Sequence, residues 1–125
     1  MRCLTVRQPW AWAIVAGPKS IENRSRRTSH RGPLLIHAGV SRCELKVETV
    51  ERWKLRYGVD RPPDDALVFG AIIGQVDLVD CVPLADLSEP SAWASGPWCW
   101  ILANPKAIEP RAASGKLGLW EADLE

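Results

Sequence analysis

The chain of 125 residues contains little of what marks several common classes of protein. It has two histidines, and its four cysteines lie far apart without forming a C-x-x-C pair. We therefore expect no zinc site and no other metal, and we expect the cysteines to be small buried side chains of a reduced protein. Neither a G-x-G-x-x-G motif nor a P-loop is present, so the usual glycine-rich phosphate cradle is missing. We expect no cofactor.

Long apolar runs are also missing. None approaches the ~18 residues that a membrane span needs, and the chain does not open on a charged and then apolar signal pattern. We expect a cytoplasmic protein without a membrane partner. The content of 46% apolar and 25% charged residues is typical of soluble globular proteins, and the length suits one domain over residues 1–125.

The net charge is only +1, but the charges are unevenly distributed. Residues 1–31 hold seven basic residues against one acidic residue, a local charge of +6, and residues 60–89 hold the reverse, a local charge of −6. This segregation predicts a basic face that could attract phosphate.

Local patterns predict a mixed α+β fold. Residues 2–6 favour a strand, and a helix is expected from Pro9 to residue 16, with Gly17 as its C-terminal cap. An extended segment over 20–24 should place Glu22 and Arg24 on one face, because side chains alternate along a strand. Residues 33–38 predict the next strand.

A second helix is expected to begin at a capping box, Ser41 to Glu44, and to end at Gly58, since apolar residues recur between them at helical spacing. Residues 67–82 form a β-branched run in which Gly70 and Gly74 mark bends or bulges. Further strands are expected at 98–103, 107–109 and 117–124. Together these elements predict a small β-barrel with two helices inserted in the N-terminal half.

The segment from Gly17 to Arg24 concentrates ionisable groups. Lys19, Glu22 and Arg24 lie within six residues, and Arg7, Gln8 and Trp10 precede them. A cation, an amide and an indole beside this cluster suit recognition of a planar polar ligand. The pattern alone leaves open whether the segment binds, does acid–base chemistry, or forms a structural ion-pair cluster.

The chain resembles the ASCH domain family, a branch of the PUA-like superfamily. The resemblance rests on a G-x-K-x-x-E-x-R pattern together with four further stretches, at residues 4–10, 35–38, 98–102 and 115–120. It implies a PUA-like β-barrel with a cleft lined by the pattern, and a link to RNA or modified nucleosides. Members of the family are associated with RNA binding, transcriptional coactivation, RNA cleavage and removal of the acetyl group from acetylated cytidine, so membership does not select one activity.

We therefore predict an RNA- or modified-nucleoside-binding protein with a basic cleft. Its ligand-binding residues would be Arg7, Gln8, Trp10, Lys19, Glu22 and Arg24. Contacts to the nucleic-acid backbone would come from Arg26, Arg27, Arg31 and Lys116. Gln8 could read a base edge, or it could cap the helix that starts at Pro9.

Two alternatives remain. The chain could be a metal-independent hydrolase, a ribonuclease or a nucleoside amidohydrolase, with Lys19 as base and Glu22 as its partner. In acetylcytidine-hydrolysing relatives the position of Glu22 is a threonine, so the amidohydrolase activity is not carried over. The other alternative is a protein-interaction module.

We expect four further aromatic or imidazole side chains in the core: His37, Trp53, Trp98 and Trp100.

Overall fold

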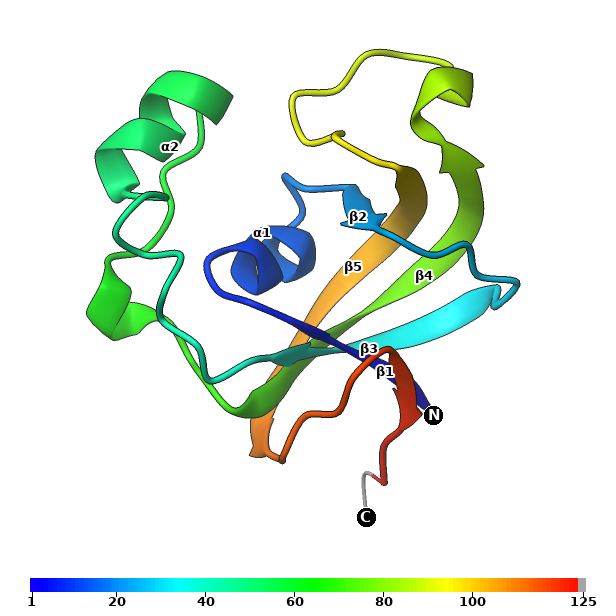
Figure 1. Cartoon of the computed structure of the whole chain (residues 1–125). Helices are drawn as coiled ribbons and strands as arrows, with labels where there is room; N and C mark the ends of the chain where they lie inside the picture. The colour runs from blue at the N-terminus through cyan, green and yellow to red at the C-terminus, as the bar shows by residue number, and fades with distance from the viewer. Residues whose placement is uncertain (124–125) are drawn as a thin grey trace.

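The computed structural model describes residues 1–123, and six strands form one curled sheet around a central helix (Figure 1). The strands are β1 (Arg2–Val6), β2 (Ile21–Arg24), β3 (Gly32–Ala38), β4 (Ala71–Pro83), β5 (Trp98–Ala112) and β6 (Leu119–Glu121), and the helices are α1 (Trp10–Ala16) and α2 (Val50–Tyr57). The strand order is β2-β5-β4-β3-β1-β6, with β1 and β3 parallel and the other pairs antiparallel. The predicted α+β fold is confirmed as a half-barrel with two helices.

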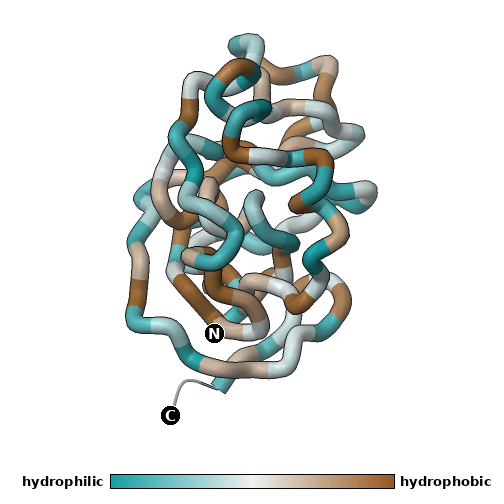
Figure 2. The backbone as a smooth tube through the Cα atoms, turned by 90° about the vertical axis from the view of Figure 1, so that its left-hand side faces the viewer, coloured by the Kyte–Doolittle hydropathy of each residue, from teal (hydrophilic) through white to brown (hydrophobic). Residues whose placement is uncertain are grey.

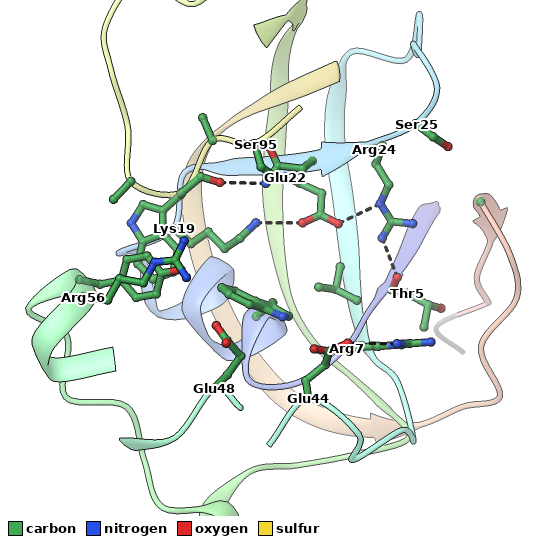
Figure 3. Close-up of a pocket in the computed structure, with 18 of the residues that line it drawn as sticks. Thr5, Arg7, Lys19, Glu22, Arg24, Ser25, Glu44, Glu48, Arg56 and Ser95 are labelled. Atoms are coloured by element: carbon green, nitrogen blue, oxygen red, sulfur yellow. Dashed lines mark hydrogen bonds and ion pairs between the residues drawn. The ribbon is translucent and has the colours of Figure 1, made fainter. Parts of the chain in front are cut away.

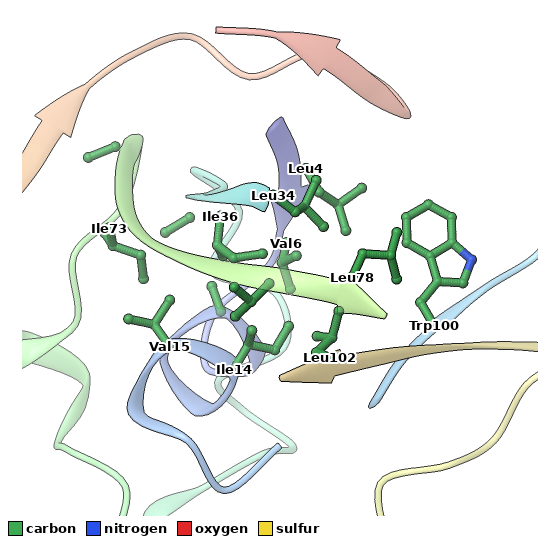
Figure 4. Close-up of a cluster of buried hydrophobic side chains, with 14 of the residues drawn as sticks. Leu4, Val6, Ile14, Val15, Leu34, Ile36, Ile73, Leu78, Trp100 and Leu102 are labelled. Atoms are coloured by element: carbon green, nitrogen blue, oxygen red, sulfur yellow. The ribbon is translucent and has the colours of Figure 1, made fainter. Parts of the chain in front are cut away.

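Helix α1 plugs the hollow of the curled sheet and contacts β3, β4 and β5. Ile14 and Val15 of this helix pack against the inner faces of the strands, where Leu34 and Ile36 of β3 point inward (Figure 4). Gly17 ends the helix with φ 110°, a left-handed conformation that glycine adopts without steric cost.

The outer face of β1 and β3 is covered as well. Cys3 and Leu35 lie in a second apolar cluster with Trp120 of β6. Both faces of these strands are therefore buried. Along the whole chain, apolar and hydrophilic residues alternate over short stretches instead of forming separate blocks (Figure 2). Burial raises the pKa of the Cys3 thiol to about 11. His37 is on this face too, 1% exposed, with Nδ1 3.2 Å from Thr5 Oγ1 and Nε2 2.7 Å from the Ala113 carbonyl. It is the hydrogen-bonded core histidine that was predicted.

The second helix begins later than its sequence signal suggested. Residues 43–47 form turns, and α2 starts only after Thr49, whose Oγ1 accepts a hydrogen bond from Arg52 N at 3.2 Å. Ser41 Oγ does accept from Cys43 N, but Glu44 is drawn to Arg7 instead of closing a capping box. Trp53 of α2 is fully buried, as predicted.

Three further predictions need correction. The strands expected at 98–103 and 107–109 are one strand, β5, in which Asn104 adopts φ 53° and the pairing with β4 shifts register. Cys43 is exposed, whereas the other three cysteines are buried as expected. The strand expected at 117–124 is confirmed only as β6, and residue 124 lies outside the described residues. No helix within residues 1–123 is long and apolar enough to cross a membrane.

Gly74 should be essential for the packing of α1 on β4. A Cβ atom at this position would lie 2.5 Å from Val15 Cγ1 and 2.7 Å from the Lys106 carbonyl oxygen. We expect Gly74→Ala to lower the free energy of unfolding by about 1–3 kcal/mol, because overpacking forces backbone shifts. Urea denaturation measures this loss.

Gly39→Ala is the matched control, since its Cβ would meet Thr5 Cγ2 at an ordinary 3.4 Å. If both variants unfold at the same urea concentration, the close approach of α1 to β4 is not what Gly74 provides.

Candidate functional site: a cleft with a charged floor and an aromatic wall

The floor of the site is an ion cluster on β2 and the turn before it. The Glu22 carboxylate lies between two cations, with Oε1 2.9 Å from Lys19 Nζ and Oε2 2.8 Å from Arg24 Nε (Figure 3). Lys19 also donates to the carbonyl of Ile21. Lys19 and Glu22 are only 4% and 7% exposed, so the cluster is held away from bulk water. The predicted sharing of one strand face by Glu22 and Arg24 is confirmed.

Arg24 also reaches across to another strand. Its Nη2 donates to the backbone carbonyl of Thr5 in β1 at 2.8 Å. Strands β1 and β2 are not neighbours in the sheet, so this side chain links two parts of the barrel that backbone hydrogen bonds do not join. The cleft lies along this seam.

An aromatic wall rises beside the charged floor. Tyr57 of α2 and Trp93 of the β4–β5 connection stack with ring centroids 3.8 Å apart and an interplanar angle of 13°. Trp10 of α1 meets both rings edge-on, at 6.3 and 6.2 Å, and packs on Trp53 at 5.1 Å. Burial raises the pKa of the Tyr57 hydroxyl above its ordinary value. Three separate elements thus place indole and phenol surface in one cleft.

Asn23 fixes the part of the wall that comes from the β4–β5 connection. Its Nδ2 donates to the Trp93 carbonyl at 2.8 Å, and its Oδ1 accepts from the amides of Ser95 and Gly96 at 2.8 and 2.9 Å. The residue between Glu22 and Arg24 therefore couples the charged floor to the aromatic wall.

The cleft between floor and wall has a volume of about 750 Å³, within the range of small-molecule sites. Its rim carries Arg7, paired with Glu44 at 3.1 Å, and Arg56, whose guanidinium lies 5.2 Å from the centroid of the Tyr57 ring. Exposed Lys116 stands at another edge. Glu48 is the third carboxylate of the cleft, so five basic side chains face three acidic ones, a local excess of +2.

The structure brings together six of the ten predicted site residues. Those that line the cleft are Arg7, Trp10, Lys19, Glu22, Arg24 and Lys116. Gln8 does not line it: the side chain is buried, its Oε1 accepts from Trp12 N at 2.8 Å and its Nε2 donates to the Val68 carbonyl at 2.9 Å. This is the helix-capping role that was the alternative for Gln8.

The arginine-rich loop after β2 lies outside the cleft lining. Arg26 and Arg27 are exposed there, and the Arg26 carbonyl accepts a hydrogen bond from Trp100 Nε1 at 3.1 Å. Arg31 donates to the carbonyls of Thr28 and His30, and it lies 3.6 Å from an Asp80 oxygen. Arg31 is thus partly committed to its own loop and to β4.

Sequence reasoning missed Tyr57, Trp93, Asn23, Arg56 and Glu48 as cleft residues. Tyr57 was visible only as one member of a helical apolar stripe, and Trp93 only as an isolated indole in a segment of small residues. Asn23 carried a signal that could have been used, because it lies inside the G-x-K-x-x-E-x-R pattern. No group of three or more His, Cys, Asp or Glu side chains suited to a metal ion occurs in the described part of the chain.

Comparison with known proteins defines the class. The model of the ASCH domain matches residues 4–112, and the chain belongs to the ASCH domain family. The fold is accordingly the small α+β, PUA-like fold of this family: crystal structures of ASCH from Zymomonas mobilis and of a mutant of the same protein each superpose with a TM-score of 0.57 and 16% identity, covering 98% of this chain and 87% and 90% of theirs.

Among curated proteins the chain is similar to activating signal cointegrator 1. It is 31% identical to the human protein and 30% identical to the mouse protein over 128 aligned positions, which cover 97% of this chain. The chain spans 22% of the length of these relatives.

The central position of Glu22 predicts an unequal response to substitution in the ion cluster. Glu22→Gln should lower the free energy of unfolding by about 3 kcal/mol, because two cations then lose their common carboxylate in a poorly solvated place. Lys19→Met should cost less, since Arg24 still balances Glu22. Urea denaturation of each variant measures both losses.

Lys54→Met is the control, because Lys54 pairs at 3.2 Å with Asp60 on the surface, where ion pairs contribute about 0–1 kcal/mol. A Glu22→Gln variant as stable as Lys54→Met would show that the cluster does not hold the seam together.

Proposed function

We propose that the cleft binds single-stranded RNA or a modified nucleoside. The observation that carries the proposal is the meeting of an aromatic wall and a charged floor in one cavity of about 750 Å³, which is large enough for a nucleoside. Proteins that bind single strands commonly stack bases on aromatic rings and track the backbone with cations. Membership of the ASCH family and similarity to part of activating signal cointegrator 1 are in keeping with this role.

In the proposed complex the base lies against the wall formed by Trp10, Tyr57 and Trp93. Lys19, Glu22 and Arg24 form the polar floor, and Arg7, Arg56 and Lys116 at the rim are placed for phosphate. Arg26 and Arg27, exposed beyond the cleft, are candidates for contacts with flanking phosphates. Arg31 is a weaker one, because its guanidinium already donates to the backbone carbonyls of Thr28 and His30 in its own loop.

Binding is better supported than hydrolysis by RNA cleavage or deacylation. As a base, Lys19 would have to act while donating to both Glu22 and Ile21, and each oxygen of Glu22 is already held by a cation. Such saturated pairs suit a rigid recognition surface more than proton transfer. A protein-interaction module remains the other alternative, and the dependence of binding on RNA and on salt separates it from the proposal.

Trp93→Ala should weaken binding of a short mixed-sequence single-stranded RNA by about 5- to 150-fold. This range corresponds to the ~1–3 kcal/mol that stacking on one aromatic side chain contributes. Trp93→Phe keeps an aromatic face on Tyr57 and should retain most of the affinity. Fluorescence anisotropy with an end-labelled RNA measures both variants, and unchanged affinity of Trp93→Ala would remove the aromatic wall from the binding site.

The rim cations should set the salt dependence of binding. Each of Arg7→Gln and Lys116→Gln should lower the slope of log K against log salt by about 0.7, the contribution of one phosphate contact on a single strand. Arg2→Gln is the matched control, because Arg2 is an exposed arginine that pairs with Glu121 and does not line the cleft. Wild-type binding that is indifferent to salt, or absent for every RNA, would favour the protein-interaction alternative.

A further inference from the structure

Glu48 is a largely buried carboxylate with few hydrogen-bond donors around it. The residue is 5% exposed, yet its side chain lines the cleft (Figure 3). Within the described residues, its side chain has one charged partner, Arg52 Nε, at the long distance of 3.8 Å. The other two carboxylates of the cleft are satisfied at shorter range, Glu22 at 2.8 and 2.9 Å and Glu44 at 3.1 Å.

The position of Glu48 is nevertheless fixed by its backbone. Its carbonyl oxygen accepts a hydrogen bond from Nε of Arg61 at 2.9 Å, and Arg61 is only 3% exposed. Glu48 also lines the same cleft as Trp10, Tyr57 and Trp93 of the aromatic wall. Glu48 is thus held firmly beside the surface on which a base would stack.

A carboxylate so placed calls for donors from a ligand. An ionised carboxylate only accepts hydrogen bonds, and one that is largely withdrawn from bulk water is stabilised by donors within hydrogen-bond range. Phosphates of an RNA carry no donors and would be repelled by it. RNA brings two kinds of donor, the single ribose 2′-hydroxyl and the N–H groups on the edges of its bases, and within a strand only a base edge can offer two adjacent donors to one carboxylate.

The bases differ in what they offer to two carboxylate oxygens. Guanine presents two adjacent donors, N1–H and the N2 amino group. Cytosine and adenine present one amino group next to an acceptor nitrogen, and uracil presents one N–H between two carbonyl oxygens, so each of these places an acceptor against the carboxylate.

We propose that Glu48 makes the cleft selective for guanine, by accepting hydrogen bonds from N1–H and N2–H of a base stacked on the wall of Trp10, Tyr57 and Trp93. The inference rests on the proposed function and adds the identity of the base. Glu48 contacts only the base edge, and Arg7, Arg56 and Lys116 carry the phosphate contacts that all sequences share.

The test compares short oligouridines that differ at one central nucleotide. The chain should bind the oligomer with guanosine about 5- to 150-fold more tightly than those with adenosine or cytidine or than oligouridine itself, the discrimination expected of a bidentate contact to a base edge. Inosine, which lacks only the N2 amino group of guanosine, should bind more weakly than guanosine. Anisotropy titrations of the wild-type chain measure these ratios, and they do not depend on any variant folding.

Glu48→Gln should reduce the ratio of guanosine to inosine affinity towards one while keeping salt-dependent binding. Glu51→Gln is the matched control, because Glu51 is an exposed glutamate of α2 that does not line the cleft, and it should leave the ratio unchanged. RNA binding without preference for guanosine would overturn the role of Glu48 and leave the proposed function standing. Failure of the wild-type chain to bind any of the oligomers would overturn both.

Discussion

The Glu22 ion cluster joins two strands that the sheet keeps apart. β2 stands at one end of the strand order, and three strands separate it from β1. Arg24 spans the seam to the Thr5 carbonyl, and Glu22 holds Arg24 in place while Lys19 balances the second oxygen. A half-barrel closed by side chains at one seam leaves a cleft there, and the geometry of the candidate site follows from that closure.

The same short strand organises the opposite side of the cleft. Asn23 ties the connection between β4 and β5 to β2 through three hydrogen bonds, and this brings Trp93 onto Tyr57. Helix α1, which packs inside the curled sheet, contributes Trp10 to the cleft. Glu22 and Arg24 of the floor and the Trp93 part of the wall are therefore positioned by one four-residue strand, whose own backbone pairs with β5. Substitutions in β2 should consequently affect stability and binding together.

Electrostatics in the cleft divides into two kinds of charge. Glu22 and Glu44 are neutralised by nearby cations and act as parts of the framework, whereas Glu48 retains acceptor capacity beside the aromatic rings. The cations of the rim are more exposed and favour any anionic backbone. In the proposed complex, the rim cations thus attract the phosphates of any RNA, and Glu48 selects the base.

The sequence by itself determined the features that depend on neighbours along the chain. Strand β1, helix α1 with its Gly17 cap, the common face of Glu22 and Arg24, and the burial of Trp53, Trp100 and His37 all follow from local periodicity and residue chemistry. Only the tertiary structure decided which polar side chains form hydrogen bonds or ion pairs within the protein and so do not face a ligand. Gln8 bonds to Trp12 and Val68, Glu44 pairs with Arg7, and α2 begins at Val50 with Thr49 as its N-cap. It alone assembled Trp10, Tyr57, Trp93 and Glu48 around one cavity, because residues 83 positions apart meet only when a sheet curls, and no local pattern encodes that distance.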